Sequence, residues 1–368
     1  MRRIGVGDLR ISDKAKANVM DVLNNSRLSY GKWQEEFEAR FSTIHGKKYA
    51  CFVNSGTDAL RLGLLAMKEH YGWPDGARVL VPAVTFVATF NIVIQAGLTP
   101  VLCDVNLDDY GIEPWGAVED CVAVLPAHLF GHVAPTRWPE DIPVLADSCE
   151  TMFQTGCANG AVSAFSTYTA HLITTGVGGL ALADDPSLAR IIRSLANHGR
   201  SGIYTGVDAP FGKPEIMSAR FFFERSGYSS RGTELQAAIG CAELDEWPRN
   251  IARRQINAEA LLDGLKGMPL HTPSYAVEDS SWMMFPLRTP TRNQRDMLVT
   301  YLEMNGIETR PLLPLTSQPY VRKMYPHSDE MFPNAHLINE TGFYVGCHQY
   351  LGPDDTDHMV SVFRKFYS

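Results

Sequence analysis

The sequence lacks an excess of basic charge. Of its 368 residues, 33 are Lys or Arg and 41 are Asp or Glu, so the formal net charge is −8. Proteins that bind a nucleic-acid backbone or an anionic membrane surface usually offer a positive field to the phosphates. We therefore expect neither nucleic acid nor membrane as a partner.

Paired cysteines and a long apolar run are also missing. The seven cysteines include no CxxC pair, so we expect no disulfide framework and no structural zinc, and we find no other metal-ligand pattern. The most apolar stretch, residues 79–97, is interrupted by proline and polar residues, and residues 1–16 lack the apolar core of a signal peptide. These features indicate a reduced, cytoplasmic protein.

Short apolar runs that alternate with helical segments dominate the first two thirds of the chain. Two amphipathic helices come first, and Ser12 is placed to cap the earlier one. Strand-like runs then follow with helical segments interspersed: YACFVN, RVLVP, TPVLCDV, CVAVLPA and IPVLAD. This order predicts an α/β fold, with a mostly parallel sheet that is covered by helices on both faces.

A smaller unit is predicted at the C-terminal end. A helical stretch over residues 233–265 should be kinked or ended at Pro248, because proline has no N–H to donate to the helix ladder. The residues beyond it read as a compact α+β unit. We therefore predict a large domain over residues 1–245 and a small C-terminal domain over residues 246–368.

Three groups of residues are candidates for binding chemistry. Gly56 and Thr57 lie between a predicted strand and a predicted helix, where unsatisfied N–H groups bind phosphate. Taken alone, an ordinary capped helix start explains such a motif more often than a phosphate site does. Asp147 follows the strand IPVLA, at the sheet edge where α/β proteins bind ligands, and Phe86 follows RVLVP in the same way. Ser166 begins a hydroxyl-rich and glycine-rich run over residues 165–179, which suits a second phosphate contact.

Ordered matches along nearly the whole chain resemble the DegT/StrS-type sugar aminotransferases. The matching runs are LSYGKWQEEFEARF, NSGTDALRLGL, VPAVTFVATFNIVIQAGLTPVLCDV, HLFGHVAP, LADSCE, NHGR, GYSSRGTELQAAIG and GIETRPLLPL. The resemblance implies the aspartate-aminotransferase-like fold of the fold-type I pyridoxal 5′-phosphate (PLP) enzymes, and a homodimer.

The same resemblance implies roles for individual residues. Gly56, Thr57 and Ser166 would hold the cofactor phosphate, Phe86 would stack on the ring, and Asp147 would pair with the pyridine nitrogen. Glu150 stands where many members have glutamine near the ring hydroxyl. Ser229 stands where an asparagine commonly reaches the cofactor phosphate of the partner subunit.

One position departs from the ordinary aminotransferases. His171 occupies the place of the lysine that binds the cofactor covalently, and imidazole has no primary amine to do so, although it transfers protons near neutral pH. Lys213 is the only plausible substitute lysine. Histidine at this position characterises a branch that resembles the GDP-4-keto-6-deoxymannose 3-dehydratases, which use pyridoxamine 5′-phosphate (PMP) and L-glutamate.

The expected function follows that branch, with alternatives left open. The first expectation is C3 dehydration of a nucleotide-linked 4-keto-6-deoxy sugar, with His171 as acid and base. Val177 and Ser229 depart from the family pattern, so transamination or other PLP chemistry is a second reading, and a catalytically silent PMP or sugar-nucleotide binding protein is a third. A lysine replaced artificially by histidine would also give this sequence, but the run TAHLITTGVGG departs from the family at several positions.

Overall fold

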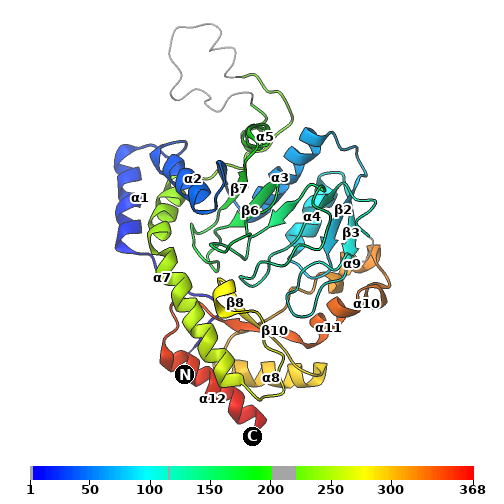
Figure 1. The fold of residues 1–368 in the computed structure, drawn as a ribbon. Coiled ribbons are helices and arrows are strands. Elements are labelled where there is room, and N and C mark those ends of the chain that lie inside the picture. Colours follow the sequence, from blue (N-terminus) through cyan, green and yellow to red (C-terminus); the bar gives the residue numbers. More distant parts are fainter. Residues whose placement is uncertain (1–2, 115–116, 201–220) are drawn as a thin grey trace.

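The computed structural model describes residues 3–114, 117–200 and 221–368. The chain begins with two helices that pack against the first part of a later long helix (Figure 1). They are α1 (Asp13–Asn25) and α2 (Lys32–Ile44). Ser12 caps α1 as predicted, because its side chain accepts a hydrogen bond from the Ala15 N–H.

The central sheet is built from two hydrogen-bonded groups of strands, ordered β1-β7-β6-β5 and β3-β2-β4. Parallel bridges from Val124 to Val144 and from Ala127 to Asp147 join the two groups into one sheet. Only β7 runs antiparallel to its neighbours, so the predicted mostly parallel α/β sheet is confirmed. The strands are β1 (Tyr49–Val53), β2 (Arg78–Pro82), β3 (Thr99–Cys103), β4 (Ala123–Val124), β5 (Leu145–Asp147), β6 (Val162–Ser166) and β7 (Gly179–Ala183).

Three helices connect these strands and pack on the sheet: α3 (Gly56–Tyr71), α4 (Val87–Gln95) and α5 (Pro186–Ala196). Helix α3 contacts β6 and β7 and is buried along most of its length. A parallel strand followed by a helix points the start of each helix at the carboxyl edge of the sheet. The α3 and α4 N-termini therefore open on the same edge.

The long helix α7 (Glu234–Leu265) continues through Pro248, so of the two expected outcomes, a kink or an end, the end at Pro248 is wrong. A proline removes one backbone donor, and packing on both sides of it offsets that loss. Leu244 and Ile251 are buried on either side, and Trp247 stacks on Phe153 with ring centroids 4.5 Å apart. One rod therefore runs from the central sheet to the C-terminal unit (Figure 1).

The C-terminal unit contains a three-stranded sheet, ordered β8-β10-β9, with helices around it. Its elements are β8 (Met284–Arg288), α8 (Arg292–Met304), β9 (Thr309–Pro311), α9 (Pro319–Met324), α10 (Ser328–Met331), α11 (Pro333–Thr341), β10 (Gly342–Gly346) and α12 (Pro353–Tyr367), with short 3₁₀ turns at Val277–Asp279 and Leu315–Ser317.

The two main apolar cores only partly follow the division into a large-sheet unit and a C-terminal unit. Ile4 and the second half of α7 belong to the core of the C-terminal unit, whereas Leu312, Val321 and Ile338 pack into the core of the large sheet. The chain therefore crosses between the two cores more than once, and the division at residues 245 and 246 stays a prediction.

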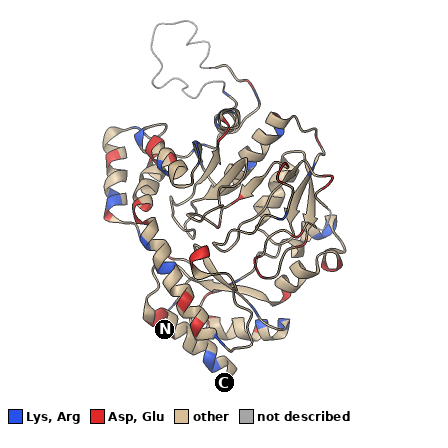
Figure 2. Cartoon of the chain, in the orientation of Figure 1, with Lys and Arg blue, Asp and Glu red and all other residues tan. Residues whose placement is uncertain are grey.

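Charged side chains gather on the peripheral helices, where both signs are intermixed (Figure 2). The strands of the large sheet carry few charges, in keeping with their burial. Within the described part of the chain, none of the helices has the length and apolar character needed to cross a membrane.

Candidate active site

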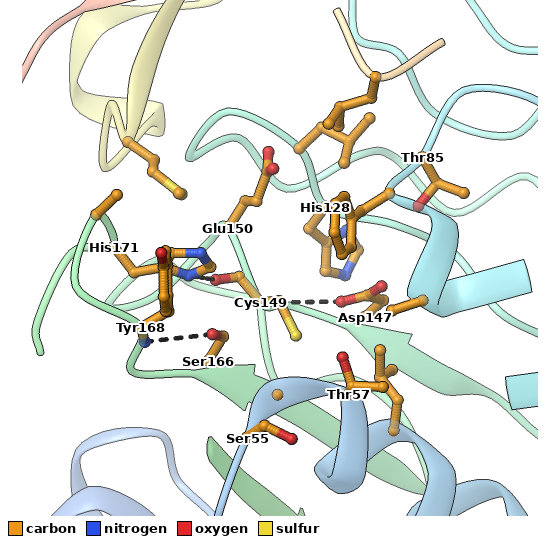
Figure 3. Close-up of a pocket in the computed structure, with 18 of the residues that line it drawn as sticks. Ser55, Thr57, Thr85, His128, Asp147, Cys149, Glu150, Ser166, Tyr168 and His171 are labelled. Carbon is orange, nitrogen blue, oxygen red and sulfur yellow. Dashed lines mark hydrogen bonds between the residues drawn. The ribbon is translucent and has the colours of Figure 1, made fainter. Parts of the chain in front are cut away.

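A cavity of about 430 Å³ lies at the carboxyl edge of the large sheet. Its floor comes from the starts of α3 and α4 and the ends of β5 and β6, and its outer wall includes residues of the C-terminal unit. Figure 3 shows Ser55, Thr57 and Ser166 on one side, Asp147 across from His171, and Glu150 between them.

The start of α3 forms a cradle for an anion. Ser55 caps the helix by accepting a hydrogen bond from the Asp58 N–H at 3.1 Å, and Gly56 and Thr57 line the cavity. A Cβ on Gly56 would lie 2.6 Å from the Ser166 Cβ and 2.9 Å from the Cys149 Sγ. Glycine is therefore required for this close approach, and the helix end and the Ser166 hydroxyl form the donor set that phosphate prefers.

Asp147 lies at the other end of the cavity and is almost fully buried. Its Oδ2 accepts a hydrogen bond from the Thr89 hydroxyl at 2.6 Å, and its Oδ1 accepts one from the Cys149 N–H at 3.2 Å. Burial raises the pKa of this carboxyl, against the opposing effect of those hydrogen bonds. A cationic ring nitrogen placed here would favour the ionised carboxylate.

Phe86 caps α4 and lines the same cavity with its ring 57% exposed. An apolar ring left open at the edge of a sheet is available to a planar ligand. The donor set, the buried carboxylate and the open aromatic ring together fit a phosphorylated pyridine, so these residues fit the cofactor that the sequence implies.

His171 lies in the loop after β6, with its Nδ1 2.7 Å from the carbonyl oxygen of Cys149. A carbonyl only accepts, so Nδ1 carries the proton and Nε2 is the basic nitrogen. Burial lowers the pKa of His171 to about 4, and the charge of Arg254 acts in the same direction. The imidazole is therefore neutral at physiological pH, with Nε2 as its unprotonated nitrogen.

Of the predicted site residues, seven line this one cavity: Gly56, Thr57, Phe86, Asp147, Glu150, Ser166 and His171. Ser229 does not; it is exposed, and its hydroxyl accepts a hydrogen bond from Arg231. Its role toward a partner subunit stays a prediction. Among the described residues that line the cavity there is no lysine, and Lys213 lies outside the described residues.

Sequence reasoning missed most of the outer wall. Tyr168 meets the His171 ring edge-on with centroids 6.0 Å apart, and the C-terminal unit contributes Met283, Met284 and Tyr344. Apolar residues near a strand give no sign by themselves that they face a cavity.

The fold and the cavity define a class of protein. A helix N-terminus that can hold phosphate, opposite a buried aspartate at the carboxyl edge of an α/β sheet, is the arrangement of a PLP-binding enzyme with the aspartate-aminotransferase-like fold.

The chain belongs to the DegT/DnrJ/EryC1/StrS aminotransferase family, whose family model matches residues 10–364. The chain is 28% identical over 376 residues to GDP-4-keto-6-deoxy-D-mannose 3-dehydratase of Escherichia coli O55:H7, which covers 94% of this chain and 95% of the relative. It is 32% identical over 321 residues to dTDP-3-amino-3,4,6-trideoxy-alpha-D-glucose transaminase of Streptomyces venezuelae, covering 80% of this chain and 76% of the relative.

A solved structure of a GDP-4-keto-6-deoxymannose-3-dehydratase with a trapped PLP-glutamate geminal diamine is similar in fold. It superimposes with a TM-score of 0.86 at 26% identity, and covers 98% of this chain and 99% of that one. The chain is thus a PLP-dependent enzyme of this family, and the predictions of fold-type I architecture, of PLP or PMP as cofactor and of enzymatic activity are confirmed.

Proposed function

We propose that this enzyme removes the C3 hydroxyl of a nucleotide-linked 4-keto-6-deoxy sugar. The observation that carries the proposal is the position of His171, a neutral imidazole in the cavity with no lysine beside it among the described lining residues. A cofactor that is not bound covalently to lysine stays free to carry an amino group, and an imidazole supplies the proton transfer that loss of a hydroxyl requires.

Each cavity residue has a task in this proposal. When bound, the cofactor supplies an electron sink. Asp147 holds a proton on the ring nitrogen through a charge-assisted hydrogen bond, which strengthens that sink. His171 takes a proton at Nε2 while the Cys149 carbonyl fixes its ring. The buried Met283 and Met284 of the outer wall keep water away from the reacting atoms.

The similar dehydratases support the substrate class, and the glutamate trapped in one of their structures supports L-glutamate as the amino donor. We also infer a homodimer, in which Ser229, exposed on its own subunit, faces the cavity of the partner. The rings of Phe86 and Tyr168 are exposed at the cavity, and a partner subunit packed over the cavity would bury them.

Transamination of a nucleotide sugar is the second candidate. It is favoured by the 32% identity to a sugar transaminase, which is above the identity to the dehydratase. The two reactions give different products, since transamination yields an amino sugar and dehydration yields a deoxygenated sugar and ammonia.

The first experiment records the absorption of the protein with PLP before and after L-glutamate, then reduces it with borohydride and measures the intact mass. The proposal predicts an unchanged protein mass and bleaching of the aldehyde band. A protein mass increased by one cofactor would show that a lysine such as Lys213 binds the cofactor covalently, and would favour transamination. If the spectrum does not change at all, the result would favour a catalytically silent PMP or sugar-nucleotide binding protein.

Product analysis with a GDP-linked 4-keto-6-deoxy sugar completes the test. His171→Asn should keep PMP affinity and lose turnover, because asparagine fills a similar volume and cannot accept a proton. Unchanged turnover in this variant would remove His171 from the mechanism.

A further inference from the structure

Glu150 is a second titratable side chain in the cavity besides His171, and its hydrogen bonding differs from that of His171. Its Oε2 accepts a hydrogen bond from the Phe130 N–H at 3.0 Å, and the structure shows no hydrogen-bond partner for its Oε1 within the described chain. Figure 3 shows the side chain reaching into the cavity beside His171. One oxygen is therefore anchored and the other is available to a ligand.

The Phe130 N–H is itself held in place by the C-terminal unit. Phe130 has a left-handed φ of 60°, and its carbonyl accepts from the Met283 N–H at 3.1 Å, while the Gly131 carbonyl accepts from the Ser281 N–H at 2.8 Å. A non-glycine residue in this conformation is held there by its surroundings. The anchor of Glu150 is therefore a fixed part of the cavity wall.

The surroundings of Glu150 favour its neutral form. Burial, and then the charge of Asp147, raise the pKa of Glu150 to about 7, although the Phe130 hydrogen bond acts in the opposite direction. The titratable groups that share the cavity with it come from four segments of the chain: His128, Asp147, Cys149, Tyr168, His171 and Tyr344. None of these is a cation at neutral pH that would favour an ionised Glu150, since burial lowers the pKa of both histidines to about 4.

We propose that Glu150 is the catalytic acid of this enzyme, which gives its carboxyl proton to the oxygen leaving sugar C3 while His171 acts as the base. This inference rests on the proposed dehydration. When a protonated carboxyl group and an unprotonated imidazole nitrogen face the same cavity, the carboxyl can act as the acid and the imidazole as the base. Glu150 thus acts directly on the substrate, beyond a contact with the cofactor ring hydroxyl.

The proposed step balances. His171 would accept one proton from a C–H bond of the bound cofactor, and the electron pair of that bond would move toward the sugar as the C3–O bond breaks. The oxygen leaves with the C3–O bonding pair, and the Glu150 proton makes it water. One molecule of water is lost, and proton exchange with solvent returns both side chains to their starting states. Over the whole turnover the sugar is reduced at C3, and the aminated cofactor would be the reductant: its amino group leaves as ammonia, and L-glutamate, the proposed amino donor, would restore it.

The test compares wild type with Glu150→Gln, which keeps the shape and the acceptor for the Phe130 N–H. Because the acid must be protonated, wild-type kcat should fall as pH rises through about 7. Glu150→Gln should be slower by roughly 100-fold at pH 6, with KM changed far less, and should lack that fall. Glu150→Asp, which retains a titrating group, should restore a fall with rising pH.

A readout independent of turnover is the infrared carboxyl band of the PMP-loaded protein. Glu150 should give a protonated band that disappears as pH rises through about 7 and that is absent in Glu150→Gln. Glu243 provides the matched control, since burial raises the pKa of this α7 carboxyl also to about 7 outside the cavity. Glu243→Gln should remove a different band and leave that of Glu150.

Two results would overturn the assignment: a Glu150→Gln enzyme with the wild-type fall in rate, or a Glu150 carboxyl that is already ionised at pH 5. The proposed dehydration fails separately. If the wild-type product is an amino sugar, dehydration is wrong whatever the infrared band shows.

Discussion

At the scale of the residue, the cofactor site depends on a buried carboxyl group, Asp147, and on the buried hydroxyl of Thr89 that donates to it. Asp147 is an acid in surroundings that favour its neutral form, and its hydroxyl partner Thr89 is itself fully buried. Its ionised form needs a cation, which a protonated ring nitrogen provides. We therefore expect the bound cofactor to favour the ionised form of Asp147, which already accepts hydrogen bonds from Thr89 and Cys149.

Asp147→Asn tests this balance. Asparagine keeps a polar side chain but cannot hold the ring nitrogen protonated, so PMP affinity should fall roughly 10- to 100-fold, as expected for loss of a charged hydrogen bond of about 1.5–3 kcal/mol. Turnover should fall further, because the electron sink is weakened. Equilibrium dialysis measures the affinity, and unchanged affinity would show that Asp147 does not contact the ring nitrogen. Asp108→Asn, in an exposed loop, is the control.

The positions of several cavity residues could be predicted from the sequence, whereas the protonation states of two of them could not. Gly56 and Asp147 could be placed because they follow predicted strands at the sheet edge where ligands bind, and because the family resemblance favoured a binding role over a helix cap. The protonation states of Glu150 and His171 could not, because they depend on burial by segments far away in the chain, such as Met283 and Tyr344.

At the scale of the element, helix starts are stabilised by carboxylates from elsewhere in the chain. Glu234, in the first turn of α7, accepts hydrogen bonds from the N–H groups of Gly31, Trp33 and Gln34 at the start of α2. Gly31 is required there, since a Cβ would lie 2.6 Å from the Glu234 Oε2. A single side chain thus joins two helices that are about two hundred positions apart in sequence.

Glu234→Ala should lower the free energy of unfolding by about 2 kcal/mol, because three backbone donors lose their partner at a buried helix end. Urea unfolding followed by circular dichroism measures the change. Glu259→Ala, an exposed position on the same helix, should change it by less than about 0.5 kcal/mol. An equal effect of the two substitutions would contradict the capping role.

Element positions were largely predictable, because apolar periodicity and caps are local signals. The exception was Pro248, where local chemistry predicts a kink or an end and the helix does not end. The helix continues because Trp247 and its neighbours pack on other elements, and no local signal carries that information.

At the scale of the whole molecule, the C-terminal segment is held to the large sheet by Asp104, just after β3. Its two carboxylate oxygens accept from the N–H groups of Asn334 and Ala335 at 2.9 Å each, and the Asn334 side chain donates to the Val105 carbonyl. The start of α11 is therefore capped by a residue of the large sheet.

Asp104→Asn should weaken this attachment by about 1–2 kcal/mol, since an amide keeps only one acceptor oxygen for the two donors. Because the C-terminal unit forms part of the cavity wall, PMP affinity should fall together with the unfolding midpoint. Thermal unfolding with and without PMP checks both, and a variant with wild-type stability would show that the attachment does not depend on Asp104.

The sequence by itself determined the α/β fold class, the family, the cofactor and the identity of the residues that line the cavity floor. These follow from strand and helix periodicity and from motifs at strand ends, which are local. Only the tertiary structure decided the outer wall, the tautomer of His171, the raised pKa of Glu150 and the continuity of α7. Each of these depends on burial and on hydrogen bonds between segments distant in the chain, and desolvation by distant segments is a property that no stretch of sequence contains.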